Sequence, residues 1–226
     1  MDTNITVITL GGLIMNINHF ELKKTALLFF DILNGYVPEA EAGKPRVLKP
    51  WIQNAVRLGK AGRAARLPVF FAKGNHRPDN ATTALILTDT NNSLVPWPNG
   101  EVVKGKMHVI AGDKSSEVLA ELEPKPEDYY IVKHRWSAFF QTYLDLALRA
   151  RGIDTIIVSG GSTDVGVAST LYSGRDLDYN MIVVSDACGT SHDQCAHDTL
   201  MEIIFPRMAR VRTTEQVIAM IEKAGK

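Results

Sequence analysis

Residues 131–190 read IVKHRWSAFFQTYLDLALRARGIDTIIVSGGSTDVGVASTLYSGRDLDYNMIVVSDACGT, and their pattern indicates the fold class. Short apolar runs at 155–160 and 180–186 alternate with stretches at 142–151 and 164–176, in which apolar residues recur every three or four positions. Runs of the first kind are typical of strands buried on both faces, and stretches of the second kind lay one helical face on a sheet. The segment therefore predicts βαβ units around a parallel sheet.

The same alternation continues on both sides of this segment. Further strands are expected at 25–31, 68–73, 129–133 and 209–212, and further helices at 45–66, 195–204 and 215–223. We predict an α/β protein with a single-domain, Rossmann-like three-layer αβα fold and a central six-stranded, mainly parallel sheet. This domain spans 21–226, and residues 1–20 are expected to form an extension that makes a hairpin or a subunit contact.

Composition narrows the class of partner. The chain has 226 residues, with 25 Lys and Arg against 25 Asp and Glu, so no net field attracts nucleic acid or an anionic membrane. No apolar run reaches the roughly 18 residues that a membrane helix requires, and the first twenty residues lack the features of a secretion signal. We expect a cytoplasmic protein with a small-molecule substrate and no nucleic-acid or membrane partner.

The two cysteines, Cys188 and Cys195, are not spaced like the ligands of a structural zinc site or the cysteines of a disulfide framework. Both are expected to be reduced thiols, with Cys195 packed in the core.

Polar residues directly after apolar runs are the candidates for chemistry, because ligands of open α/β sheets bind at the carboxyl ends of the strands. Asp31 ends the first run of the main pattern, Lys133 ends the third, and the glycine-rich turn 160–166 follows the fourth. An Asp and a Lys in a partly dry cleft form an acid/base pair, and the turn offers backbone N–H groups to an anion. The competing interpretation is a helix-capping aspartate and a surface lysine.

The segment 75–125 differs from the rest of the chain. It is rich in Asn, Thr, Pro and Gly and is too long for a plain connection. We expect it to cover the candidate site. His76, within it, is interpreted as a loop or subunit-contact residue.

Three stretches together resemble one known family. TALLFFDILN at 25–34, HRPD at 76–79 and the long segment quoted above are similar to the isochorismatase-like hydrolases, often called cysteine hydrolases. That family includes nicotinamidases, N-carbamoylsarcosine amidases, ureidoacrylate and biuret hydrolases, and isochorismatase. The resemblance runs from about residue 25 to the last predicted helix and implies a hydrolase.

The resemblance also implies roles for individual residues. Asp31 corresponds to the general acid/base and Lys133 to the lysine that stabilises charge beside it. The Gly161–Ser162 bond corresponds to a non-proline cis peptide. The N–H groups of Ser162 and Gly166 would then form the oxyanion hole.

One position departs from the family pattern. Amide-cleaving members read T-D-V-C-V with a nucleophilic thiol, whereas this chain reads TDVGV at 163–167 and has Gly166 in the place of the cysteine. Isochorismatases also lack that cysteine and cleave an enol ether through the aspartate. Our leading hypothesis is a hydrolase in which water replaces the thiol. The alternatives are an amide or ureide hydrolase inactivated by a Cys-to-Gly change, and a non-catalytic binding homologue.

The remaining expectations concern the pocket and the assembly. Aromatic and polar walls suit a small planar or cyclic substrate, and His134 and Arg135 would meet a substrate carboxylate. Nicotinamidases, which are members of this family, bind a metal, and this chain lacks the full set of their metal ligands. We therefore expect no metal and no cofactor. Members of this family assemble, which implies a homodimer or homotetramer. The proposed pocket walls are Asn34, Tyr36, Trp136, Phe139 and Tyr172.

Overall fold

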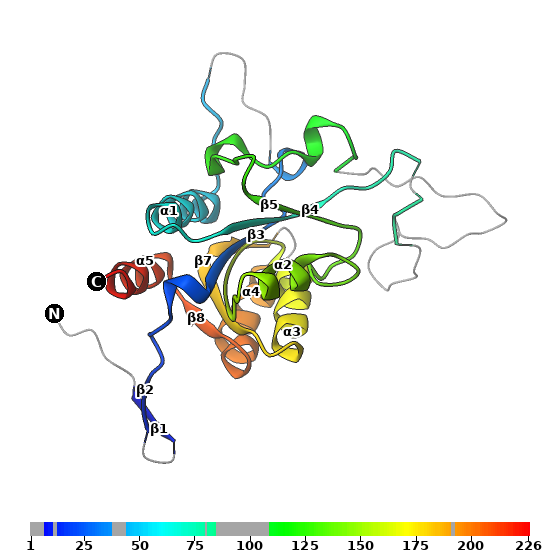
Figure 1. The fold of residues 1–226 in the computed structure, drawn as a ribbon. Coiled ribbons are helices and arrows are strands. Elements are labelled where there is room, and N and C mark those ends of the chain that lie inside the picture. Colours follow the sequence, from blue (N-terminus) through cyan, green and yellow to red (C-terminus); the bar gives the residue numbers. More distant parts are fainter. Residues whose placement is uncertain (1–6, 11–12, 38–43, 80, 85–108, 191–192) are drawn as a thin grey trace.

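The computed structural model describes residues 7–10, 13–37, 44–79, 81–84, 109–190 and 193–226. Six parallel strands form the central sheet in the order β5-β4-β3-β6-β7-β8 (Figure 1). The strands are β3 (Thr25–Phe30), β4 (Val69–Gly74), β5 (Tyr129–Lys133), β6 (Thr155–Gly161), β7 (Asn180–Gly189) and β8 (Arg210–Arg212). The predicted α/β class and six-stranded sheet are confirmed, and every strand of this sheet runs parallel to its neighbours.

Helices cover both faces of the sheet, which makes three layers. Alternate residues of β3 enter two separate cores: Leu27 and Phe29 join one, and Leu28 and Phe30 join the other. This alternation follows from the two-residue period of a strand. The helices are α1 (Pro50–Ala64), α2 (Leu144–Ala150), α3 (Ala168–Asp176), α4 (Gln194–Thr199) and α5 (Thr214–Ala224).

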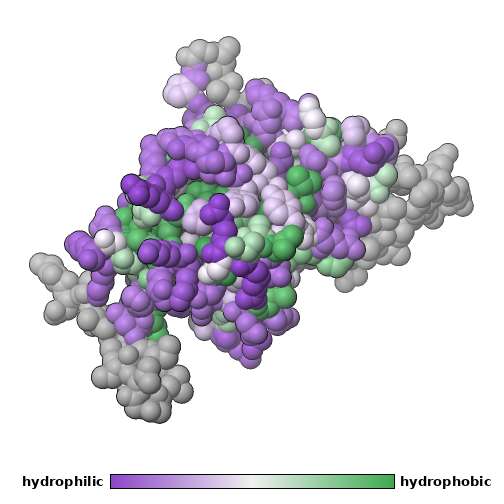
Figure 2. Space-filling view, in the orientation of Figure 1, coloured by the Kyte–Doolittle hydropathy of each residue, from purple (hydrophilic) through white to green (hydrophobic). Residues whose placement is uncertain are grey.

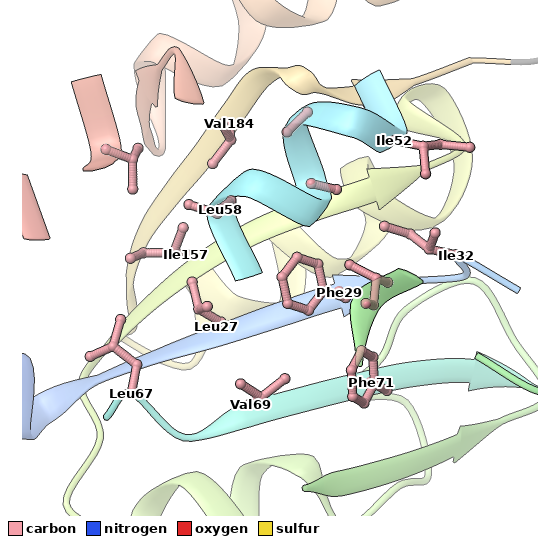
Figure 3. Packing of buried hydrophobic residues seen from close by; sticks show 14 of the residues in the cluster. Leu27, Phe29, Ile32, Ile52, Leu58, Leu67, Val69, Phe71, Ile157 and Val184 are labelled. Carbon is pink, nitrogen blue, oxygen red and sulfur yellow. The ribbon is translucent and has the colours of Figure 1, made fainter. Parts of the chain in front are cut away.

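The first core lies under α1 and α5. Ile52 and Leu58 of α1 pack against Leu27, Phe29 and Phe71 of the sheet, as Figure 3 shows in close-up. The second core, on the opposite face, holds residues of α2 and α3 against the sheet. Burial on both faces explains why the central strands carry uninterrupted apolar runs.

Some boundaries differ from those that the sequence predicts. The first helix begins at Pro50 rather than at residue 45, because proline is favoured in the first turn and lacks the N–H that a helix interior needs. The helix expected at 195–204 is composite: α4 ends at Thr199, a π-helical segment covers Leu200–Ile204, and a 3-10 turn (Phe205–Arg207) follows.

The N-terminal residues form a separate two-stranded antiparallel sheet of β1 (Val7–Leu10) and β2 (Leu13–Asn16). The chain that follows β2 is tied to the main sheet by Arg210, whose guanidinium donates to the carbonyl oxygens of Ile17 and His19. The extension therefore meets the edge of the sheet at β8.

No helix in the described ranges has the length and apolar content needed to cross a membrane.

Candidate active site

The candidate site lies at the carboxyl ends of β3, β4, β5 and β6. After β3 the chain proceeds to β4 on one side, and the later strand β6 pairs with β3 on the other side. Such a change of direction opens a crevice at the strand ends. Asp31 and Lys133 follow β3 and β5, which are not neighbours in the sheet, because β4 lies between them.

The strand between them contributes to the site. Asp31 follows β3 with a positive φ of 48°, a conformation that aspartate tolerates better than most residues. The Asp31 Oδ1 accepts a hydrogen bond from the N–H of Gly74 at 2.8 Å, and Oδ2 accepts one from Lys133 Nζ at 2.6 Å. The carboxylate is thus bound from β4 and β5 at once.

Burial makes this pair more than a surface ion pair. The exposed fractions of the two side chains are 7% for Lys133 and 10% for Asp31. A buried charge needs both a partner and hydrogen bonds, and here each group receives them. The Lys133 ammonium also lies 4.3 Å from the centroid of the Phe30 ring, a cation–π contact that fixes its position from below.

The Tyr36 hydroxyl and the Asp31 carboxylate both lie near Gly74. A Cβ placed on Gly74 would lie 3.6 Å from Asp31 Oδ1 and 3.8 Å from the Tyr36 hydroxyl, so both groups converge over that glycine. The residue as a whole is 48% exposed. Burial around the hydroxyl raises the pKa of Tyr36, and the negative charge of Asp31 raises it further, so the phenol stays protonated and can donate.

Two histidines stand beside the pair. His76 follows β4 and His134 follows Lys133, and their ring centroids lie 6.0 Å apart with the rings edge to face. Burial is the main cause that lowers the pKa of His76, and the neighbouring His134 and Lys133 lower it further. Because that imidazole is neutral at pH 7, it can donate or accept a hydrogen bond. His76 lies outside the named strands, in the connection that follows β4, and it also stands near the site.

The turn after β6 has an unusual backbone. The Gly161–Ser162 peptide bond is cis, and residues Thr163–Val167 form a π-helical turn before α3. The amides of Val165 and Val167 both donate to the Ser162 carbonyl oxygen, at 3.3 and 3.2 Å. The helix expected to start at 164 is therefore widened in its first turn, a feature that π-bulges often bring to functional sites.

Side chains brace this turn. Asp164 Oδ1 accepts hydrogen bonds from the hydroxyls of Ser162 and, at 3.0 Å, Thr190. On the other side the Thr163 hydroxyl lies 2.8 Å from Nδ1 of His197 in α4. These contacts tie the turn to the end of β7 and to α4.

Gly166 is buried in the turn and lies against the Phe30 ring. Since the same ring lies beneath the Lys133 ammonium, the structure brings Asp31, Lys133 and Gly166 together around Phe30. Sequence reasoning had missed both Phe30 and Gly74. Phe30 is one apolar residue in a run of them, so nothing in its pattern singles it out.

The residues predicted to form the pocket walls do not all lie at one site. Trp136 and Phe139 line a hollow of about 490 Å³ with Arg135, Ser137, Phe140, Ser169 and Ser173, which includes neither Asp31 nor Lys133. Phe139 also stacks on Tyr179, with centroids 5.5 Å apart. Asn34 is engaged elsewhere: its side chain donates to the Lys114 carbonyl oxygen and accepts from Arg46. Tyr172 lies on α3 with 48% of its surface exposed.

Surface character around these elements is mixed. The face seen in Figure 2 is largely hydrophilic, with hydrophobic groups exposed between polar ones. Trp136 and Phe140 are among the exposed aromatic side chains, at 57% and 52%.

The segment 75–125 reaches the site in its described parts. His76 forms a parallel bridge with Ile110, and Leu33 forms an antiparallel bridge with Val118. Residues 109–119 therefore lie along the loop that follows Asp31. The central part of the predicted excursion, 85–108, lies outside the described residues.

The two cysteines differ in exposure. Cys188 is buried in β7, and burial raises the pKa of its thiol to about 12. Cys195 is exposed on α4, so the expectation that it packs in the core was wrong. The helical period that placed it inward belongs to a longer regular helix than the one observed, which ends at Thr199. Across the described ranges, no three His, Cys, Asp or Glu side chains converge as metal ligands would.

Comparisons with known proteins agree with this architecture. A family model described as "Isochorismatase domain" matches residues 25–216. The isochorismatase family protein YwoC of Bacillus subtilis (strain 168) is 31% identical over 92% of this chain and 100% of its own length. The ureidoacrylate amidohydrolase RutB of Acinetobacter baylyi is 31% identical over 74% of this chain and 71% of its own.

Solved structures agree as well. An isochorismatase family protein from Burkholderia thailandensis superposes with a TM-score of 0.70 at 32% identity, covering 88% of this chain and 96% of that one.

Proposed function

The chain belongs to the isochorismatase family of hydrolases, and we propose that it hydrolyses a small planar or cyclic metabolite with water as the nucleophile. Asp31 is the general acid/base in this proposal, and Lys133 stabilises charge. The observation that carries it is the doubly held Asp31 carboxylate, bound by the Gly74 N–H at 2.8 Å and by Lys133 at 2.6 Å, beside a turn that has no side chain at 166.

Asp31 starts the reaction as a carboxylate paired with an ammonium, and it is therefore a proton acceptor. In hydrolysis of a C–N bond it takes a proton from water while the water oxygen attacks the carbonyl carbon. The C–N bond then breaks, the electron pair leaves with nitrogen, and Asp31 returns the proton to that nitrogen. Lys133 balances the negative charge of Asp31 before the attack and again after the proton has been returned.

Hydrolysis of an enol ether requires Asp31 to donate a proton first and to accept one afterwards. A protonated Asp31 gives its proton to the vinyl carbon, water adds to the resulting cation, and Asp31 takes the proton back from that water. The hemiketal then collapses to a ketone and an alcohol. The ion pair with Lys133 favours the order in which Asp31 first accepts a proton. The similarity to a ureidoacrylate amidohydrolase supports hydrolysis of a C–N bond.

Substrate recognition is proposed to use the groups around the pair. The Tyr36 hydroxyl lies near Gly74, as the Asp31 carboxylate does, and His76 and His134 lie beside Lys133. Arg135 follows, with its guanidinium bonded to the Thr82 and His134 carbonyl oxygens. This cluster is richer in positive than in negative groups, which favours a substrate that carries a carboxylate.

A panel of small ureides, amides and enol ethers, each with and without a carboxylate, tests the proposal. Ammonia release and chromatographic product detection report the two bond classes. Turnover of a carboxylate-bearing member, with no covalent adduct in the intact protein mass during turnover, is the expected result. Ligands that raise Tm but are never turned over would support a binding homologue and overturn the proposal.

A further inference from the structure

Phe30 occupies the space that a side chain at position 166 would need. A Cβ built on Gly166 would lie 2.0 Å from Phe30 Cε1 and 2.2 Å from Phe30 Cζ. Real Cβ atoms essentially never come closer than 3.0 Å to such neighbours. Any residue other than glycine at 166 therefore requires the ring to move.

The ring has little freedom to do so. Phe30 is 1% exposed and belongs to a core cluster that also holds Ile131, Val158 and Val167. Interiors are packed at crystal-like density, so a displaced ring would collide with these neighbours. The upper side of the ring is covered by the Lys133 ammonium at 4.3 Å from its centroid.

The backbone of Phe30 is fixed as well. Phe30 pairs with Ala72 of β4 and with Gly160 of β6, so it lies between two strands of the parallel sheet. Gly160 has a φ of 141°, and a Cβ there would lie 2.1 Å from the Phe30 carbonyl oxygen. The backbones of β3 and β6 thus approach each other as closely as glycine permits at this point.

We propose that Phe30 and Gly166 form a reciprocal pair that closes the position of a side-chain nucleophile and sets the site for water. Phe30 is a positioning residue in this pair: its ring fills the vacated volume and supports Lys133 against Asp31. The catalytic part of the inference rests on the proposed function, whereas the packing part stands without it.

The packing part is tested by a stability cycle. Gly166→Ala should lower Tm by several degrees in the parent protein, because overpacking a core is destabilising. In a Phe30→Val background, which removes the ring, the same change should leave Tm unchanged or raise it. Gly59→Ala is the matched control. Gly59 lies within α1, and a Cβ added there would lie 3.4 Å from Phe29, an ordinary contact distance. The Gly59→Ala change should therefore be neutral or stabilising in both backgrounds.

Equal losses of Tm from Gly166→Ala in both backgrounds, or none in the parent, would overturn the pair. This outcome does not depend on any substrate, so it is distinguishable from failure of the proposed hydrolysis.

Thiol chemistry gives a second readout. In a Cys195→Ser background, the Phe30→Val/Gly166→Cys double variant should react with iodoacetamide at position 166, as read by peptide mass spectrometry. Gly166→Cys alone should react much more slowly or should fold poorly, because Phe30 still fills the space. Equal reactivity of the single and double variants would contradict the proposal.

The positioning role is read from kinetics on the substrate found above. Phe30→Val should lower kcat by at least tenfold with less than a threefold change in KM, because the ring touches Lys133. Adding Gly166→Ala to Phe30→Val should recover part of kcat. An unchanged kcat in Phe30→Val would overturn the positioning role and leave the packing result standing.

Discussion

The Asp31 carboxylate depends on groups from two other strands, one for each oxygen. Gly74 of β4 offers a backbone N–H, which no substitution removes except proline, whereas Lys133 of β5 offers a side chain. The lysine is therefore the partner that mutation can test. Because both side chains are nearly buried, removing one charge leaves the other without compensation.

Lys133→Met should lower the free energy of unfolding by about 3 kcal/mol, since it leaves a buried carboxylate unpaired. Asp31→Asn/Lys133→Met removes both charges and should be more stable than the sum of the single losses predicts. Urea denaturation of the four proteins measures the coupling. Additive losses would show that the two side chains do not interact in solution.

Cysteine reactivity separates the two thiols at the residue scale. Burial raises the pKa of Cys188 to about 12, so very little of it is thiolate at pH 8, whereas Cys195 is exposed. Iodoacetamide at pH 8 should alkylate Cys195 in the folded protein and spare Cys188, with both modified in guanidinium chloride. Peptide mapping reads the sites. Fast alkylation of Cys188 in the folded state would show that its thiol is accessible and reactive, and would contradict its burial in β7.

At the scale of elements, β5 carries Lys133 and must itself be anchored. Arg63 of α1 donates two hydrogen bonds to Asp128, at 3.0 and 2.6 Å, one residue before β5 begins. The exposed fractions are 15% for the Arg63 side chain and 4% for Asp128. The bidentate geometry is specific to arginine. This pair fixes the start of the strand that ends in the site.

Arg63→Met should cost about 3 kcal/mol in the free energy of unfolding, because Asp128 is left buried without its cation. Arg63→Lys should lose less, since an ammonium keeps the charge but not the two-point contact. Chemical denaturation measures both losses. Equal stability of all three proteins would mean that the pair contributes nothing to anchoring β5.

The turn between β6 and α3 shows where element prediction ends. The sequence indicates a helix from 164 to 176, and α3 begins only at Ala168 after a π-helical turn. Helical periodicity cannot distinguish the two, because they differ by one hydrogen-bond register over five residues. Gly166 lies within this widened turn, against Phe30.

At the scale of the whole molecule, the layers were predictable and the neighbours were not. Apolar runs and amphipathic stretches identified all six strands of the main sheet, because burial on both faces leaves a plain mark in sequence. Strand order leaves no such mark, and so β4 was not foreseen between Asp31 and Lys133. The same limit hid Gly74 and Phe30, which matter through contacts between distant segments.

The family resemblance carried the site further than residue patterns did. Asp31 and Lys133 were singled out by their positions at strand ends, the resemblance gave them their roles, and the structure joins them at 2.6 Å. Asn34 shows the opposite case, since its amide is engaged with Lys114 and Arg46, contacts that no local pattern encodes. Which residues line a pocket depends on contacts between distant segments of the fold, whereas the position of a carboxylate at a strand end depends on that strand alone.

The turnover number of Asp31→Asn on the substrate found in the panel tests the central claim most directly. Asn keeps the shape and a hydrogen-bonding oxygen but cannot exchange the proton with water, so kcat should fall by about 10²–10⁴-fold while the protein stays folded by circular dichroism. A kcat for Asp31→Asn within a few-fold of the parent would contradict general acid/base catalysis by Asp31, and with it the proposed function.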